Sequence, residues 1–298
     1  MKYQQLGKSS LQISMIGFGC MSLKPGSPEN EKVIHLAMEA GINFFDTADL
    51  YDKGLNEMML GRILKPKRRQ IIIATKAGNQ WRSDGSGWDW NPGKKHILKA
   101  AEESLKRLQT DYIDLYQLHG GTIEDPIEET IDAFETLKRQ GKIRYYGISS
   151  IRPNVINEYI RLSNIVSVMM QYSLLDRRPE ENCLSLLKEN RIGVSARGPL
   201  AKGLLVDKPA AHFLNYSEDE VRKAANAVSS LSGKERNKAE TALQFVLNNP
   251  AVTAAVVGIR TSGQLKDIAQ TCEMPMLSDD EMNFLRQSIP VNYYDQHR

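Results

Sequence analysis

The sequence has few cysteines, no long apolar run and no dominant charge. Its 298 residues include three cysteines, Cys20, Cys183 and Cys272, which are widely spaced and form no CxxC pair. An odd set of this kind disfavours a disulfide framework and favours a reduced, cytoplasmic protein. The first ten residues lack the apolar core of a signal peptide, and no apolar run approaches the roughly 20 residues of a membrane span. We therefore expect a cytoplasmic protein that does not associate with membranes.

The charge balance also argues against nucleic acid as a partner. The net charge is only +3, which gives no general case for nucleic acid binding. The densest basic run, KPKRRQ at residues 65–70, is typical of a solvated loop. With 41% hydrophobic and 25% charged residues the composition is that of an ordinary globular protein. We expect a monomer or a weak homo-oligomer that acts on a small molecule.

Short apolar runs alternate with helical patterns along almost the whole chain. A near-continuous apolar strand is typical of a parallel sheet that helices cover on both faces. Eight strand–helix units in fewer than 300 residues fit a (β/α)8 barrel, the TIM-barrel architecture, in one domain of residues 1–298. The eight strand candidates are MIGFGC, FFDTA, IIIATK, YIDLYQLH, IRYYGIS, VSVMMQYS, IGVSARG and VTAAVVGI.

Two further segments lie outside the eight units. The stretch KYQQLGKSSLQIS, residues 2–14, predicts a short β-hairpin that would plug the lower end of the barrel. The stretch DDEMNFLRQSI, residues 279–289, predicts an extra C-terminal helix. A doubly wound sheet is the alternative fold, but no GxGxxG follows the first strand candidate.

Polar residues follow the apolar runs, at the strand ends where the active site of such a barrel lies. Asp46 comes directly after two phenylalanines, and Lys76 ends the next strand candidate. Neighbouring strands would bring the two together and so compensate the buried carboxylate. Other polar or flexible residues at the strand ends are Tyr51, His119, Ser149, Ser150, Gln171, Arg197, Gly258 and Arg260.

Four of these residues suit general acid catalysis. A phenol with a pKa of about 10 is a poor acid near neutrality. A lysine ammonium beside it stabilises the phenolate, so we expect Lys76 to lower the pKa of Tyr51. Asp46 would keep Lys76 charged and in place, and His119 would orient the oxygen of the substrate. The result is a proton donor aimed at one oxygen atom.

Other chemistries fit this set of residues less well. The five histidines are scattered and only His119 ends a strand, so no metal site is expected and a zinc hydrolase is disfavoured. A glycosidase needs two carboxylates across the barrel mouth, where Gln171 and Arg197 stand instead. A Schiff-base lyase would use Lys76 as its nucleophile, but Asp46 should keep this lysine charged. Hydride transfer from a nicotinamide remains.

Four stretches resemble signatures of the aldo-keto reductase family, in the right order and over almost the full chain: INFFDTADLY, IIIATKAG, TDYIDLYQLHG and GKIRYYGISS. The resemblance implies NADPH as the cofactor and aldehydes or ketones as substrates. It implies that Asp46, Tyr51, Lys76 and His119 form the catalytic tetrad. Relatives of this fold also serve as partners of membrane channels, so a nicotinamide-binding regulatory subunit is the alternative function.

The segments after the last two strands predict the phosphate end of the cofactor site. Gly198 and Gly203 would allow close backbone approach to a pyrophosphate, and Lys202 would add charge or remain solvated. Arg260 has the planar fork that suits a 2′-phosphate, and the helix that follows it opens with amides that suit a phosphate. The full expected cofactor set is Gly19, Cys20, Met21, Asp46, Ser149, Ser150, Gln171, Arg197, Gly198, Leu200, Lys202, Gly203, Gly258, Arg260, Gln264 and Asp267. By the resemblance, Ser149, Ser150 and Gln171 hold the nicotinamide carboxamide, and Gln264 and Asp267 lie near the adenine.

The chain departs from the family pattern at three positions. Many relatives carry asparagine in place of Ser150 and of Ile268, and an aromatic residue in place of Arg197. We expect the Arg197 guanidinium to lie near the nicotinamide where the aromatic ring would stack. The alternative is that Arg197 turns away and binds the pyrophosphate.

The three tryptophans occur together in the segment GNQWRSDGSGWDWNPG, residues 78–93. Tryptophans in a polar loop are plausible walls of an apolar pocket, or they pin down the loop itself. We expect Trp81 and Trp88 to contact the substrate together with Tyr51 and His119.

Overall fold

The computed structural model describes all residues from 1 to 298. Eight parallel strands close into a barrel in the order β10-β11-β12-β3-β4-β5-β8-β9. The predicted (β/α)8 barrel is confirmed. The strands are β3 (Ile16–Gly19), β4 (Phe44–Asp46), β5 (Ile72–Ala77), β8 (Ile113–Leu118), β9 (Ile143–Ser149), β10 (Ser167–Gln171), β11 (Gly193–Arg197) and β12 (Val252–Gly258).

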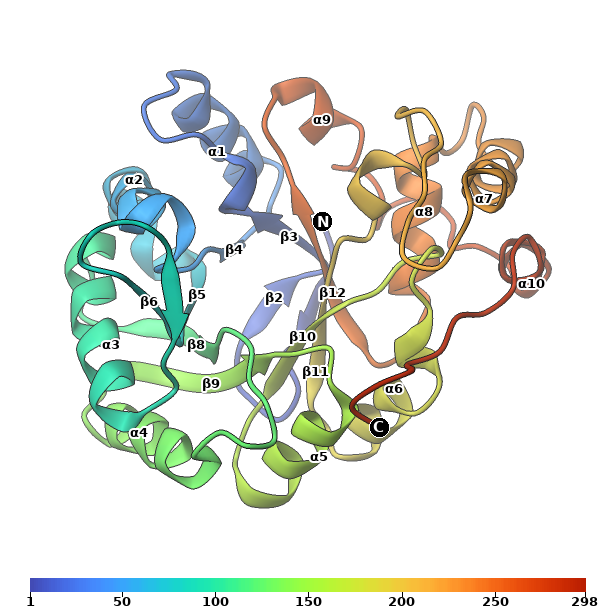
Figure 1. The fold of residues 1–298 in the computed structure, drawn as a ribbon. Coiled ribbons are helices and arrows are strands. Elements are labelled where there is room, and N and C mark those ends of the chain that lie inside the picture. Colours follow the sequence, from blue (N-terminus) through green and yellow to red (C-terminus); the bar gives the residue numbers. More distant parts are fainter.

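A ring of helices surrounds the strands (Figure 1). None of these helices has the length and apolar character that crossing a membrane requires. The helix α10 (Asp279–Gln287) is additional to the strand–helix units, as predicted. The others are α1 (Glu29–Glu39), α2 (Leu55–Leu64), α3 (Lys94–Leu108), α4 (Ile127–Arg139), α5 (Pro153–Leu162), α6 (Cys183–Glu189), α7 (Glu218–Ser230), α8 (Lys238–Leu247) and α9 (Ser262–Lys266), with short 3-10 turns η1 (Cys20–Ser22), η2 (Tyr51–Gly54), η3 (Lys65–Gln70), η4 (Arg178–Glu180) and η5 (Ala201–Gly203).

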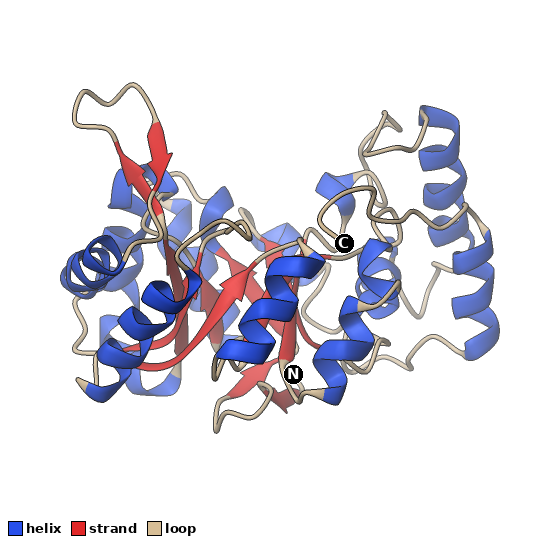
Figure 2. Cartoon of the chain, turned by 60° about the horizontal axis from the view of Figure 1, so that its bottom comes forward, coloured by secondary structure: helices blue, strands red, loops and turns tan.

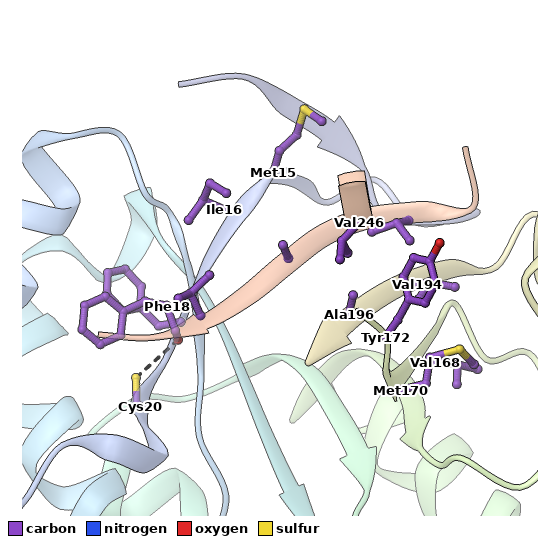
Figure 3. Close-up of a cluster of buried hydrophobic side chains, with 14 of the residues drawn as sticks. Met15, Ile16, Phe18, Cys20, Val168, Met170, Tyr172, Val194, Ala196 and Val246 are labelled. Carbon is purple, nitrogen blue, oxygen red and sulfur yellow. Dashed lines mark hydrogen bonds between the residues drawn. The ribbon is translucent and has the colours of Figure 1, made fainter. Parts of the chain in front are cut away.

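The side chains on the two faces of each barrel strand pack in two different hydrophobic clusters. Alternate side chains such as Phe18, Met170 and Ala196 pack outward against the helices (Figure 3). The intervening positions form a smaller cluster inside the barrel, which includes Phe44 and Leu115. This alternation decides which strand residues face the barrel axis.

The N-terminal hairpin closes the lower end of the barrel. Strands β1 (Tyr3–Gln5) and β2 (Gln12–Ser14) pair antiparallel, as predicted. Leu6, Leu11 and Ile13 from this hairpin are buried in the inner cluster. The hairpin thus blocks this end, so a ligand would have to enter at the carboxyl ends of the strands.

A second hairpin projects from the opposite end of the barrel (Figure 2). Strands β6 (Asn79–Trp81) and β7 (Trp88–Trp90) pair antiparallel and place Trp81 opposite Trp88. The sequence predicted a loop here. An aromatic cross-strand pair, together with the bidentate Arg82–Asp89 ion pair, stabilises the hairpin in spite of its glycines.

Candidate active site

Strand alternation directs the predicted catalytic side chains into the open end of the barrel. On β5, Ile72 and Ala74 belong to the inner cluster, so Lys76 is the next residue to face the axis. The same spacing leads from Phe44 to Asp46 on β4, from Leu115 through Gln117 to His119 after β8, from Met169 to Gln171 on β10, and from Ser195 to Arg197 on β11.

Lys76 and Asp46 form a buried ion pair at this end. The Lys76 Nζ donates to Asp46 Oδ2 at 2.7 Å and to the Thr47 carbonyl oxygen at 2.7 Å. Burial alone would lower the pKa of the lysine, but Asp46 and Tyr51 more than offset it, so this pKa lies above its ordinary value. The predicted pairing is present, and it keeps Lys76 in the charged form, which is a poor Schiff-base nucleophile.

Tyr51 lies beside this pair in the turn that follows β4. The Lys76 Nζ is 5.3 Å from the centroid of the Tyr51 ring. The His119 ring meets Tyr51 edge-on, with centroids 5.8 Å apart. The structure thus brings all four predicted catalytic residues into one cluster.

The expected lowering of the Tyr51 pKa is wrong for this structure. Burial raises the pKa of the phenol above 10 and outweighs the opposing charge of Lys76. The physical reason is that a phenolate in this partly closed site loses more hydration than one nearby ammonium restores. Tyr51 therefore holds its proton firmly at neutral pH, in the form that a proton donor needs.

His119 is a neutral imidazole in this site. Burial lowers its pKa to about 3, and the positive charges of Lys76 and Arg197 act in the same direction. Its Nδ1 is buried without a hydrogen-bond partner. A neutral imidazole carries one N–H donor, which suits a contact with a substrate oxygen.

The Arg197 side chain points to Gln171, which the resemblance assigns to the nicotinamide carboxamide. Its Nη1 donates to Gln171 Oε1 at 2.7 Å. Because a guanidinium has only donors, the Gln171 oxygen is engaged and its Nε2 remains able to donate to another acceptor. Ser149 ends β9 half-buried, and Ser150 is buried with its Oγ accepting from the Arg152 N–H at 3.2 Å.

The loops after β11 and β12 carry two cations that have no acidic partner. Lys202 and Arg260 are both exposed, and neither forms an ion pair. Gly198 and Gly203 have φ angles of 66° and 93°, in the left-handed region that favours glycine. Unpaired cations beside an accessible backbone fit the phosphates of a dinucleotide, so the residues present suit the implied cofactor. Of the remaining expected contacts, Leu200 is half-buried, Asp267 is exposed and Gln264 accepts from the Arg260 N–H at 2.9 Å.

The ends of β3 and β12 contribute mainly backbone. Gly19 pairs in register with Gly258, and Met21 beyond it is 67% exposed. Cys20 is fully buried with its Sγ 3.6 Å from the Phe18 carbonyl oxygen, and burial raises the pKa of this thiol (Figure 3). The Cys20 side chain therefore faces the core rather than a ligand.

The three tryptophans of the β6–β7 hairpin have different environments. Trp90 is an anchor, since its Nε1 donates to both carboxylate oxygens of Asp125 at 3.0 Å. Trp88 is 48% exposed, and Trp81 is half-buried with the Lys53 Nζ 5.0 Å from its ring centroid. Because Lys53 is two residues beyond Tyr51, this contact places Trp81 next to the catalytic turn.

Three polar residues near the site were not predicted from the sequence. Gln117 is fully buried on the inner face of β8, and neither of its side-chain polar atoms has a partner. Gln117 lies at an alternate position between Leu115 and His119, and this spacing indicates that it also faces the barrel axis. Glu57 on α2 and Arg107 on α3 form an ion pair, and no local pattern marked them as partners.

Comparisons with known proteins show which proteins the chain resembles. The model of the Aldo/keto reductase family matches residues 15–289. An uncharacterized oxidoreductase of Bacillus subtilis, YqkF, is 48% identical over 307 residues, which span 100% of both chains. The holo form of the aldo-keto reductase AKR11C1 from Bacillus halodurans superposes with a TM-score of 0.95 at 48% identity, covering 100% of this chain and 99% of that one. The apo form of the same protein gives a TM-score of 0.85 at 46% identity, with the same coverage.

Proposed function

The chain belongs to the aldo/keto reductase family of oxidoreductases, and from this premise we propose that it reduces aldehydes or ketones to alcohols with NADPH. The observation that carries the proposal is the buried Lys76–Asp46 pair beside Tyr51 and His119. The high similarity to a relative in its holo form supports a cofactor-dependent activity. We further propose that the chain works as one domain, as a monomer or weak homo-oligomer.

In this mechanism NADPH, when bound, supplies the hydride for the carbonyl carbon. Tyr51 donates its phenolic proton to the carbonyl oxygen as the negative charge develops there. The Lys76 ammonium stabilises the phenolate that remains, and Asp46 holds this ammonium charged and in place. The N–H of neutral His119 orients the carbonyl oxygen toward Tyr51.

The cofactor contacts follow from the donors that remain available. Gln171 would donate through Nε2 to the carboxamide oxygen, because its own oxygen is held by Arg197. Lys202 would lie at the pyrophosphate and Arg260 at the 2′-phosphate, where a bidentate guanidinium binds well. The other proposed contacts are Gly19, Cys20 and Met21 through their backbone, Ser149 and Ser150 at the carboxamide, Gly198, Leu200, Gly203 and Gly258 along the diphosphate, and Gln264 and Asp267 near the adenine, with Trp81 and Trp88 facing the substrate.

The proposal is tested by NADPH binding and turnover measured on the same preparation. A fluorescence titration with NADPH should show saturable binding, and NADPH oxidation should follow addition of an aldehyde. Binding without turnover across aliphatic, aromatic and dicarbonyl substrates would support a regulatory nicotinamide-binding subunit instead. Borohydride trapping of a substrate on Lys76 would revive the Schiff-base lyase.

We predict that kcat for carbonyl reduction is nearly constant between about pH 5 and pH 9. The pKa of His119 is lowered to about 3, so the imidazole becomes charged only well below this range. The pKa of Tyr51 is raised, so the phenol loses its proton only above the range. The measurement is kcat against pH at saturating NADPH and substrate. A tenfold change in kcat centred near pH 6.5 would show that His119 titrates during the reaction. It would contradict the assignment of His119 as a neutral imidazole.

We predict that Arg197 makes the site favour NADPH over NADP⁺. The oxidised nicotinamide is a cation, and two unit charges about 5 Å apart repel by roughly 3 kcal/mol at an effective dielectric of 20. Water and the phosphates of the cofactor should reduce this to about 1 kcal/mol, or several-fold in affinity. Arg197→Tyr should therefore tighten NADP⁺ relative to NADPH, which titrations with both forms would measure.

The alternative position of Arg197 gives a different result. If its guanidinium bound the pyrophosphate, the substitution would weaken both forms equally and leave their ratio unchanged. The hydrogen bond from Arg197 to Gln171 favours the nicotinamide position. Lys202→Met, which removes a cation from the loop after β11, is the matched control and should weaken both forms to the same extent.

A further inference from the structure

The backbone directly after Tyr51 has an unusual conformation. Asp52, Lys53 and Gly54 have φ angles of 49°, 55° and 85°, so three successive residues lie in the left-handed region. Residues other than glycine are strained there. Such strain persists only where the surrounding structure holds the segment in place, and it is common at functional sites.

The position of Tyr51 depends on this turn. Lys76 lies beside the Tyr51 hydroxyl, but the ring itself is placed by the backbone of this turn and by packing. Misplacing a catalytic group by about 1 Å costs up to a hundredfold in rate. Whatever holds the turn of residues 51–54 therefore contributes to the placement of the proton donor.

Arg107, in the last turn of α3, lies directly against this turn. A Cβ atom built on Gly54 would lie 2.7 Å from Arg107 Cδ and 2.8 Å from Arg107 Nε. The arginine side chain thus packs flat on the α-carbon of Gly54, and any larger residue at position 54 would displace it. Helix α3 therefore contacts the catalytic turn through the Arg107 side chain.

Arg107 is itself fixed by a buried hydrogen-bond network. Its Nε donates to Glu57 Oε2 at 2.7 Å, and its Nη2 donates to Ser104 Oγ at 3.1 Å. Glu57 is fully buried, and its Oε1 accepts from Thr75 Oγ1 at 2.6 Å. Thr75 directly precedes Lys76 on β5, so the network connects the turn of Tyr51 with the strand that carries the lysine.

We propose that Arg107 is a positioning residue for carbonyl reduction. Through its packing on Gly54 it holds the strained turn that places Tyr51. Through Glu57 and Thr75 it fixes this turn relative to β5 and therefore relative to Lys76. The role rests on the proposed function of Tyr51 as the proton donor. Arg107 touches neither the substrate nor the cofactor and acts only through its neighbours.

The test compares the double variant Glu57→Gln/Arg107→Met with Glu57→Gln alone. This pair is chosen because Arg107→Met by itself would leave the buried Glu57 carboxylate without its cation and could unfold the protein. We expect kcat to be about ten- to a hundredfold lower in the double variant than in Glu57→Gln, with the NADPH dissociation constant unchanged. Lys106→Met, an exposed change on the same helix, is the matched control and should keep the wild-type kcat. Equal kcat values for the double variant and Glu57→Gln would overturn the proposal.

Two further measurements separate positioning from a general structural role. In a Tyr51→Phe background, the same comparison should show no further loss, because the group that Arg107 positions is already absent. A full additional loss in that background would overturn the proposal. Amide hydrogen exchange at residues 52–55 should be faster in the double variant than in Glu57→Gln, and unchanged exchange would also overturn it. Hydrogen exchange can be measured without turnover, so the two proposals can fail separately. An inactive wild type would count against the proposed function. An active wild type, together with equal exchange in the double variant and Glu57→Gln, would count against the role of Arg107 alone.

Discussion

Tyr51→Phe is expected to lower kcat for carbonyl reduction by about 10²–10⁴-fold, the usual contribution of general acid catalysis. The substitution removes only the hydroxyl group that carries the proton. The phenylalanine ring can keep the packing of Tyr51 beside Lys76 and His119, so the shape of the site should be preserved. NADPH binding should therefore be unchanged. Steady-state kinetics and a fluorescence titration on the same variant measure the two effects.

A tyrosine at the other end of the barrel provides the control for this substitution. The Tyr3 hydroxyl on β1 donates to the Gly41 carbonyl oxygen at 2.9 Å, at the end of the barrel that the N-terminal hairpin closes. Tyr3→Phe should leave kcat at its wild-type value. If Tyr51→Phe retained more than half of the wild-type activity, Tyr51 would not be the proton donor.

The fold could be predicted because the signals for a parallel barrel are local. Each apolar run is short enough for a strand, and each following segment has its own apolar stripe. Ile97, Ala101, Leu105 and Leu108 recur at helical spacing in the sequence, and all four are buried along α3. The segment LNEMMLGRIL also has apolar residues at helical spacing, and it forms α2 at Leu55–Leu64.

The composition of the catalytic cluster was predictable for a similar reason. A closed parallel barrel gathers all strand ends at one rim, so residues distant in sequence meet there. Asp46 and Lys76 are on adjacent strands, and Phe45 pairs with Ile73 in the register between them. The order of the strands was therefore enough to predict the Asp46–Lys76 ion pair from the sequence.

The energetics of the cluster could not be predicted in the same way. The pKa of Tyr51 depends on how deeply the phenol is buried, which is a property of the assembled structure. From the sequence only the neighbouring charge of Lys76 was visible, and it acts in the opposite direction. The pairing of Glu57 with Arg107 was also hidden, because these residues lie on different helices and each appears within an ordinary amphipathic pattern.

Arg260→Ala is expected to weaken NADPH binding by about 1.5–3 kcal/mol, the contribution of a hydrogen bond to a charged group. This corresponds to about a 10- to 150-fold higher dissociation constant. Arg260 is exposed directly beyond β12 and has no acidic partner, so its guanidinium is available to the 2′-phosphate. NADH lacks this phosphate and should bind almost unchanged. Titrations of the wild type and the variant with both cofactors measure the difference.

The control for Arg260 separates its charge from its shape. Arg260→Lys keeps the positive charge but loses the planar fork that binds a phosphate through two hydrogen bonds. We expect an NADPH affinity between those of the wild type and Arg260→Ala, again with little effect on NADH. The backbone N–H of Arg260 donates to Gln264 Oε1, and this contact is retained in both variants, so the start of α9 should be preserved. Equal weakening of NADPH and NADH in Arg260→Ala would indicate a folding defect at this helix and would contradict the assignment to the 2′-phosphate.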